Sequence, residues 1–309
     1  MSTVNEFDES IKQDFLNGAP VLPEVYADKE ECYGREITIR GKKNSYDTYF
    51  NEKHGKKILQ KIDNGIKQRY KDGKGGEFKY KFFSVASSSR FAVASFSNNV
   101  SNKIMYINQY SGEEISEILF EKDLPINNIS GTPPQMDVWI RTSHDIFFEV
   151  KCHEIFDESQ HANIKLSTQY SNNRIFNEII NYYSIDLSTR KRTNVKEGNV
   201  KSYYLLNRNM FKVSTQTAHF DMKQFICHLM GIISYKENKK VDSMVEFNYL
   251  FYKNDDKQFN KVYIELENEI SVIMKSFEWL FSKYNIKFSC YYNSRFSTLE
   301  RTLPFMMIS

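Results

Sequence analysis

Residues 135–141, QMDVWIR, and residues 146–152, IFFEVKC, are the stretch of sequence that decides the fold. Both runs are rich in β-branched and aromatic residues, a composition typical of strands. The four residues between them, Thr142-Ser143-His144-Asp145, form a short polar segment of the kind found in turns. The sequence therefore predicts a β-hairpin over residues 135–152, with its turn centred between Ser143 and His144.

This hairpin is predicted to bring three charged residues together at its open end. The turn places Asp137 opposite Val150, so that Asp137 is flanked across the strand by Glu149 and Lys151. Because side chains alternate along a strand, Glu149 and Lys151 share one face. Charges on such an apolar strand are costly to bury unless they are paired or bind a metal ion. We therefore expect a cluster of two carboxylates and one ammonium group.

Such a cluster suits metal-assisted hydrolysis of a phosphodiester. Two carboxylates can hold a hard divalent cation such as Mg²⁺ through oxygen ligands, and the cation lowers the pKa of a bound water. A neighbouring lysine can orient that water, help to deprotonate it, or stabilise charge on the phosphate. The alternative is structural: Glu149 and Lys151 lie on the wet face of an edge hairpin and pair with each other or with Asp137.

The same residues resemble the signature of a known nuclease superfamily. Pro134-Gln135-Met136-Asp137, followed after a turn by Phe148-Glu149-Val150-Lys151, looks like the motif of the PD-(D/E)XK superfamily. The continuation Cys152-His153-Glu154 is similar to that of bacterial restriction endonucleases. The aspartate of this motif usually follows a proline, and here Met136 holds that place.

The resemblance implies an α/β protein with a restriction-endonuclease-like core, in which helices flank a central mixed sheet. It implies an Mg²⁺-dependent endodeoxyribonuclease, with Mn²⁺ as a substitute, that acts in restriction or defence. Asp137 and Glu149 would bind the metal and Lys151 would be the catalytic lysine. DNA is the implied substrate, and analogy with restriction enzymes suggests a homodimer. The alternatives are a nucleic-acid-binding protein that keeps the fold without cutting, and a protein unrelated to nucleic acids in which the charges are structural.

Two further positions are implied by the resemblance. The superfamily often has a glutamate on the helix before the hairpin, and Glu117 and Glu121 are the candidates here, with Glu121 preferred as a metal ligand. Many members also carry a polar residue on a later helix, and Gln224 resembles it. Gln224 and His228 lie four residues apart and share a helix face. Solvated helix glutamates, a surface polar pair and a core histidine are the structural alternatives.

Elsewhere the predicted helices and strands alternate, which favours a mixed sheet flanked by helices. Residues 111–122 are predicted to be a helix because Ser111 and Glu114 form a capping-box pattern. Other helices are predicted over residues 50–70, 163–183, 220–234 and 262–284. Strands are predicted over residues 78–85, 91–96, 201–206, 245–252 and 287–292, and a glycine-rich turn at residues 72–76.

The chain as a whole is expected to be one domain, 1–309, with residues 1–45 as an N-terminal extension packed on the core. Its net charge of +3 does not by itself indicate a polyanionic partner. Basic residues outnumber acidic ones between Lys53 and Lys81, however. That cluster could follow a phosphate backbone or form a solvated helix face.

Cysteine spacing and hydropathy indicate the compartment. The four cysteines lie far apart and form no CxxC pair, which argues against a zinc or redox motif and suits a reducing compartment. The first 13 residues lack the pattern of a signal peptide, and no run of about 20 apolar residues occurs. We therefore expect a cytoplasmic protein without a membrane partner.

Overall fold

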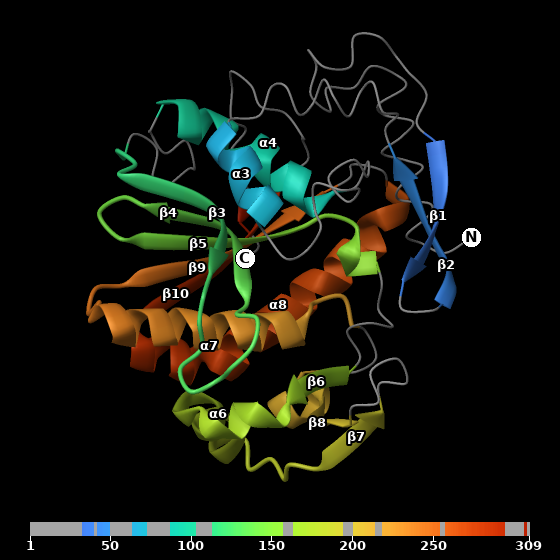
Figure 1. The fold of residues 1–309 in the computed structure, drawn as a ribbon, viewed down its shortest axis with the longest axis vertical. Helices are drawn as coiled ribbons and strands as arrows, with labels where there is room; N and C mark the ends of the chain where they lie inside the picture. The colour runs from blue at the N-terminus through green and yellow to red at the C-terminus, as the bar shows by residue number, and fades with distance from the viewer. Residues whose placement is uncertain are drawn as a thin grey trace.

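The computed structural model describes residues 33–39, 42–49, 64–72, 87–102, 113–156, 163–193, 200–213, 218–253, 257–293 and 306–307. Its centre is a six-stranded mixed sheet with the strand order β11-β10-β9-β5-β4-β3 (Figure 1). The strands are β3 (Glu117–Asp123), β4 (Gln135–Arg141), β5 (Asp145–Lys151), β9 (Val245–Tyr252), β10 (Ile286–Asn293) and β11 (Met306–Met307). β5, β9 and β10 run parallel, and the other three strands pair antiparallel with their neighbours.

Helices cover both faces of this sheet. α7 (Met222–Lys239) and α8 (Asn260–Tyr284) lie on one face, and α3 (Asn64–Asp72) and α4 (Ser88–Asn102) lie on the other (Figure 1). Every residue of β9 is buried, as expected for a parallel strand that is covered on both sides. The predicted α/β class with a mixed sheet between helices is therefore confirmed.

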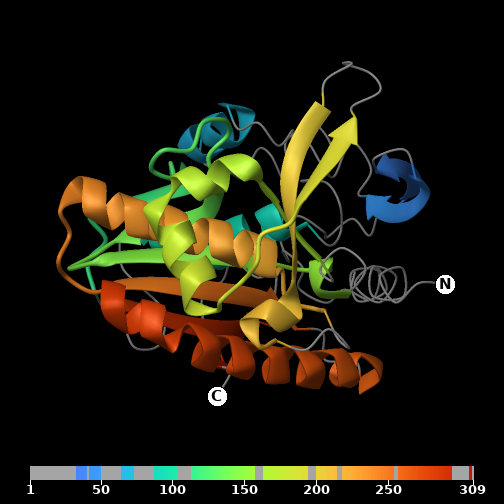
Figure 2. The same ribbon diagram turned by 90° about the horizontal axis from the view of Figure 1, so that it is seen from below.

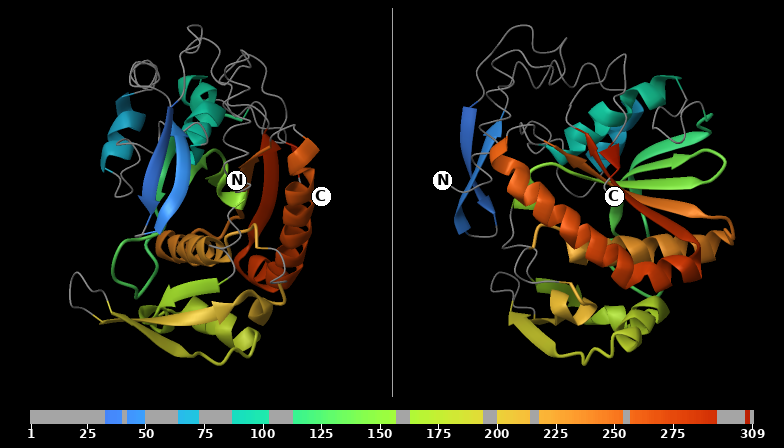
Figure 3. Two further views of the ribbon diagram at one scale, coloured as in Figure 1. Left: turned by 90° about the vertical axis from the view of Figure 1, so that its right-hand side faces the viewer. Right: turned by 180° about the vertical axis from the view of Figure 1, so that it is seen from behind.

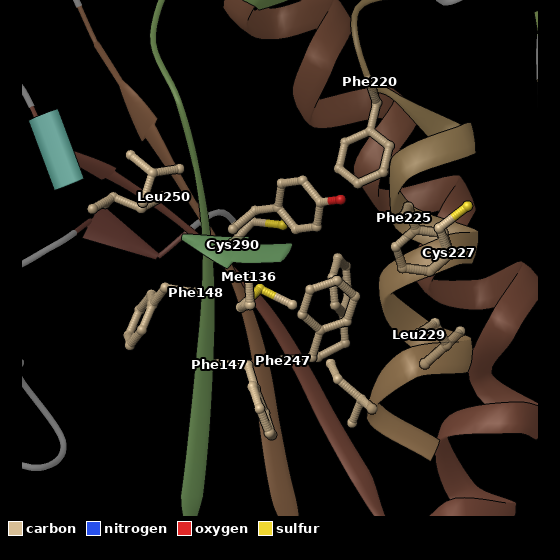
Figure 4. Close-up of a cluster of buried hydrophobic side chains, with 14 of the residues drawn as sticks. Met136, Phe147, Phe148, Phe220, Phe225, Cys227, Leu229, Phe247, Leu250 and Cys290 are labelled. Atoms are coloured by element: carbon tan, nitrogen blue, oxygen red, sulfur yellow. The ribbon is translucent and has the colours of Figure 1, made fainter. Parts of the chain in front are cut away.

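Aromatic side chains fill both interfaces between sheet and helices. On the α7 face, Phe225 stacks on Phe247 with ring centroids 5.9 Å apart. On the α4 face, Phe96 packs on Phe148 at 4.8 Å. Figure 4 shows Phe225 and Leu229 of α7 directed toward the sheet, whereas Phe148 lies on its other side. Adjacent residues of β5 face opposite sides of the sheet. Phe148 therefore lies on the opposite side from the charged residues of this strand.

A second, smaller sheet adjoins α7. It has the order β6-β8-β7 and is fully antiparallel. Its strands are β6 (Asn163–Ser167), β7 (Thr189–Thr193) and β8 (Val200–Asn207), and α6 (Arg174–Tyr182) covers one side through stacking of Phe176 on Tyr204. Short 3₁₀ helices connect the elements: η4 (Glu154–Phe156), η5 (Thr168–Asn172), η6 (Arg208–Phe211) and η7 (Lys257–Phe259). A separate hairpin consists of β1 (Tyr33–Ile39) and β2 (Lys42–Tyr49).

Most predicted elements from residue 135 onward are confirmed. The hairpin strands β4 and β5, the later strands β8, β9 and β10, and the helices α7 and α8 lie where the sequence predicts them, within a few residues. Cys152, Cys227 and Cys290 are free thiols, in agreement with their isolation in the sequence. The predicted strand over 78–85, the turn residues 73–76 and most of the regions 1–45 and 50–70 lie outside the described residues.

The prediction of a strand over residues 91–96 is wrong, because these residues belong to α4. The Ser87 hydroxyl accepts a hydrogen bond from the Arg90 backbone N–H at 3.1 Å, in the manner of a helix N-cap. The serines before residue 91 therefore begin the helix. A short apolar run buried on a sheet has no periodicity that distinguishes helix from strand.

The predicted helix over residues 111–122 is also wrong. Residues 117–123 form β3, which pairs antiparallel with β4. The apolar spacing of Ile115, Leu119 and Phe120 imitates a helix, but the free edge of β4 supplies backbone partners that no local pattern reveals. The predicted helix over 163–183 is correct only for α6, because residues 163–167 are β6. Their burial alternates strictly, with Ile164 and Leu166 buried.

A close contact brings α7 against the residue that follows β3. A Cβ atom on Gly231 would lie 2.8 Å from the Cβ atom of Leu124 and 3.0 Å from its carbonyl oxygen. We expect Gly231→Ala to lower the free energy of unfolding by roughly 1–3 kcal/mol through overpacking. Urea denaturation would measure this. Alanine is about 1 kcal/mol better than glycine inside a helix, so an increase in stability would show that the contact is not as close as described.

Candidate active site

The hairpin forms with a register one residue away from the predicted one. Arg141 pairs with Asp145 and Val138 with Phe148, so the turn is centred on residue 143. The Thr142 N–H donates to the His144 carbonyl at 3.0 Å and closes a three-residue turn. The predicted backbone pairing of Asp137 with Val150 is therefore wrong. The polar segment 142–145 has four residues, but its last residue, Asp145, already belongs to β5, so the turn has only three.

The Asp137 side chain nevertheless reaches Val150. Its Oδ2 atom accepts a hydrogen bond from the Val150 backbone N–H at 2.7 Å. The described β4–β5 pairing ends at Val138 and Phe148, so this carboxylate takes the place of the next backbone acceptor. Asp137 is thereby held against the strand that carries Glu149 and Lys151.

Lys151 lies between two side-chain oxygens. Its Nζ atom is 2.5 Å from Glu149 Oε1 and 2.7 Å from Gln224 Oε1. Glu149 is buried, and the Lys151 side chain is only 12% exposed. Gln224 lies in the first turn of α7, where its backbone N–H donates to the N-cap residue Asp221 at 2.9 Å. α7 thus presents an amide oxygen that fixes the ammonium group of β5.

His228 completes the buried side of the cluster. Its Nδ1 atom is 3.3 Å from Glu149 Oε2, and both residues are 1% exposed. Burial, and to a lesser extent the charge of Lys151, lower the pKa of His228 to about 3. A hydrogen bond with the backbone of Gln135 engages the ring, and Nδ1 itself has no hydrogen-bond partner among the described residues. The neutral ring therefore turns an acceptor toward Glu149.

Burial and like charge make the two carboxylates hard to ionise. Burial raises the pKa of Glu149 to about 7, although Lys151 opposes the shift. Burial also raises the pKa of Asp137 well above its usual value, and the charge of Glu149 adds to that shift. Both carboxyl groups hold protons more tightly than free side chains do, so a cation that replaced those protons would relieve the repulsion.

Lys151, by contrast, is held in its charged form. Burial alone would lower the pKa of Lys151, but Glu149, Glu154 and Asp137 outweigh it and raise the pKa. Glu154 follows directly on the hairpin, and its Oε2 atom accepts from the Cys152 backbone N–H at 2.6 Å. The ammonium group therefore supplies a fixed positive charge at the open end of the hairpin.

The two predicted helix glutamates lie on β3. Glu117 pairs in register with Arg141 and forms an ion pair with it at 3.7 Å, at the turn end of the hairpin. Glu121 lies between residues paired with Val138 and Met136, so it neighbours Asp137. Its φ is +52°, and its carbonyl oxygen accepts from Arg69 at 3.0 Å. The helix expected to carry these glutamates is replaced by a strand because β4 offers a free edge.

The structure thus brings together Asp137, Glu149 and Lys151, as predicted, and places Gln224, which the resemblance implies, beside Lys151. His228, which shares a helix face with Gln224, lies beside Glu149. Sequence reasoning missed Asp221, whose charge acts on the pKa values of Glu149 and Lys151. An aspartate just before a helical apolar pattern is an N-cap signal that could have drawn attention to it.

Two carboxylates at this site fit a magnesium ion, which is usually held by one or two carboxylates and keeps several waters. Asp137 and Glu149 are the residues that would hold it. The orphaned Glu149 Oε2 atom, which accepts from no donor within the described residues, supports this fit. Among those residues no group of three or more histidine, cysteine or acidic side chains is arranged to hold a metal.

The helices that the structure describes include none with the length and hydropathy needed to cross a bilayer. Comparison of the chain with known protein families, curated proteins and solved structures finds no match.

Proposed function

We propose that this chain is a nuclease of the PD-(D/E)XK superfamily that hydrolyses DNA phosphodiester bonds with Mg²⁺. One observation carries the proposal: the Lys151 ammonium group lies between Glu149 and Gln224, beside Asp137 at the open end of one hairpin. A structural ion pair would need only one carboxylate for the lysine. Here two further carboxylates, of Asp137 and Glu154, also act on it. A role in restriction or defence rests on the sequence resemblance.

Bound Mg²⁺ would supply Lewis acidity at the phosphate and would make an attacking water more acidic. Asp137 and Glu149 would hold the cation through their carboxylate oxygens. Lys151 keeps its proton because its pKa is raised, so it donates hydrogen bonds and does not act as the base. It would stabilise negative charge that develops on the phosphate oxygens. Gln224 is a positioning residue that holds the ammonium group in place.

The direct test is cleavage of plasmid and single-stranded DNA by the full chain with Mg²⁺, Mn²⁺ or EDTA. We expect cutting with either metal and none with EDTA. Salt-dependent DNA binding without cutting of any substrate would favour a non-cleaving nucleic-acid-binding protein. Absence of both activities would support a structural role for the charges.

Metal affinity should depend on pH, because Mg²⁺ competes with protons for Glu149. With a pKa of about 7, Glu149 is mostly protonated at pH 6 and mostly ionised at pH 8. We expect the Mg²⁺ concentration that half-saturates the thermal shift to rise about tenfold per pH unit below pH 7 for each proton displaced. Melting temperatures measured across Mg²⁺ concentrations at pH 6, 7 and 8 would test this.

Without metal, stability depends on pH in the opposite direction: it falls as the pH rises, whereas Mg²⁺ affinity rises. The folded protein binds the Glu149 proton more tightly than the unfolded chain does, so this group's contribution to stability falls as pH rises from about 4.5 to about 7.

Glu149→Gln is the control for the Mg²⁺ measurement, because it has no carboxyl proton to displace. A thermal shift by Mg²⁺ that survives in Glu149→Gln with the same pH dependence would place the metal elsewhere.

A further inference from the structure

The smaller sheet has one covered face and one open face. Ile164 and Leu166 are buried on the covered face. The residues that alternate with them, Asn163, Lys165 and Ser167, are exposed. Tyr204 of β8 lies on the covered side, stacked on Phe176 of α6.

Strand register gathers basic side chains on this open face. Arg190 pairs with Tyr203, and Arg192 pairs with Lys201. Lys165 pairs with Leu205, and Tyr203 and Leu205 alternate with the covered residue Tyr204. Directly paired residues point to the same side of a sheet. The basic face therefore consists of the four exposed cations Lys165, Arg190, Arg192 and Lys201, with Tyr203 among them.

Among the described residues, the cations of the basic face have no acidic partner. β6, β7 and β8 contain no acidic residue. Within the described ranges, none of the four cations forms an ion pair. Arg192 and Lys201 lie directly opposite each other, and such like-charged pairs destabilise a sheet. A bound polyanion would relieve that repulsion.

The segments before and after the smaller sheet both connect in sequence to the candidate active site. β6 begins at Asn163, twelve positions after Lys151, and contacts α7. β8 leads through η6 to Asp221 and Gln224 at the start of α7. Figure 2 shows β7 and β8 in yellow reaching out from the body of the molecule, and both views of Figure 3 show the smaller sheet beside α7. The smaller sheet therefore lies against the helix whose Gln224 contacts Lys151.

We infer that the basic face binds the phosphate backbone of duplex DNA outside the bond that is cut. This rests on the proposed function, because the same DNA would occupy both places. Arginine and lysine on an exposed sheet match phosphates in charge. Backbone contacts of this kind position the duplex without reading its sequence.

The test compares the full chain with Arg192→Gln/Lys201→Gln, using fluorescence anisotropy with a 30-base-pair duplex in EDTA from 50 to 200 mM salt. If both cations contact phosphates, the slope of log affinity against log salt should become less negative by about 1.8, at about 0.9 per contact. The matched control is Lys239→Gln/Lys240→Gln, which removes two exposed charges at the far end of α7. Its slope should stay at the wild-type value.

Folding of the variant is checked by its melting temperature, which should not fall because a repulsive pair is removed. An unchanged slope or an equal change in the control would overturn the inference. So would absence of duplex binding by the wild type. Binding in EDTA requires no catalysis, and the cleavage test changes no residue of the basic face. Failure of one proposal is therefore distinguishable from failure of the other.

Discussion

Replacing Lys151 by methionine is expected to lower the rate constant of metal-dependent DNA cleavage by about 10²–10³-fold. The methionine keeps a long side chain of similar shape but removes the ammonium group that lies 2.5 Å from Glu149 and 2.7 Å from Gln224. The variant loses stabilisation of the negative charge that develops on the phosphate in the transition state. Because this interaction is stronger in the transition state than in the bound substrate, kcat should change more than KM. Single-turnover cleavage of a labelled duplex would measure the rate constant.

Asp137→Asn is the companion variant. The asparagine retains an oxygen that can accept from the Val150 N–H, as Asp137 does at 2.7 Å, but it carries no charge for a metal. We expect cleavage to be lost while the hairpin stays folded. Lys275→Ala, which removes an exposed lysine of α8, is the matched control and should cut like the wild type. Cleavage that survives both Lys151→Met and Asp137→Asn would refute the assignment of this site.

The second large effect is on stability. Glu269→Ala is expected to lower the free energy of unfolding by about 3–5 kcal/mol, because it removes the carboxylate from a buried ion pair. Arg208 is fully buried, and its Nη2 atom lies 2.8 Å from Glu269 Oε2. The same carboxylate accepts from the backbone N–H groups of His219 at 3.1 Å and Phe220 at 2.9 Å. Denaturation with urea or guanidinium would measure the loss.

A double-mutant cycle tests whether the ion pair causes this loss. Arg208→Met in the Glu269→Ala background removes the buried charge that the single variant leaves behind. The double variant should therefore lose less stability than the sum of the two single variants. Strict additivity of the two losses would contradict a coupled buried pair.

This ion pair also bears on the candidate site. Glu269 belongs to α8, Arg208 begins η6 after β8, and Phe220 directly precedes the N-cap residue Asp221 of α7. One carboxylate therefore anchors the end of the smaller sheet and the start of the helix that carries Gln224. We attribute the placement of Gln224 beside Lys151 partly to this anchor.

Local pattern was misleading where a neighbouring element decided the conformation. Residues 117–123 have helix-like apolar spacing but form β3, which pairs with the edge of β4. Residues 91–96 resemble a strand but lie in α4. In both cases, the competing interactions are backbone pairing and burial contributed by residues distant in sequence. A short segment with weak periodicity is the kind that such contacts can override.

The sequence by itself determined the hairpin and the common face of Glu149 and Lys151, because alternation along a strand is a property of adjacent residues. Only the tertiary structure decided that Asp137 bonds to Val150 through its side chain, since a turn one residue shorter than the polar run moved the register. It also decided that Gln224, His228 and Asp221 close around Lys151 and Glu149. These residues come from a helix some 70 positions further along the chain, and only the packing of α7 on the sheet brings them there.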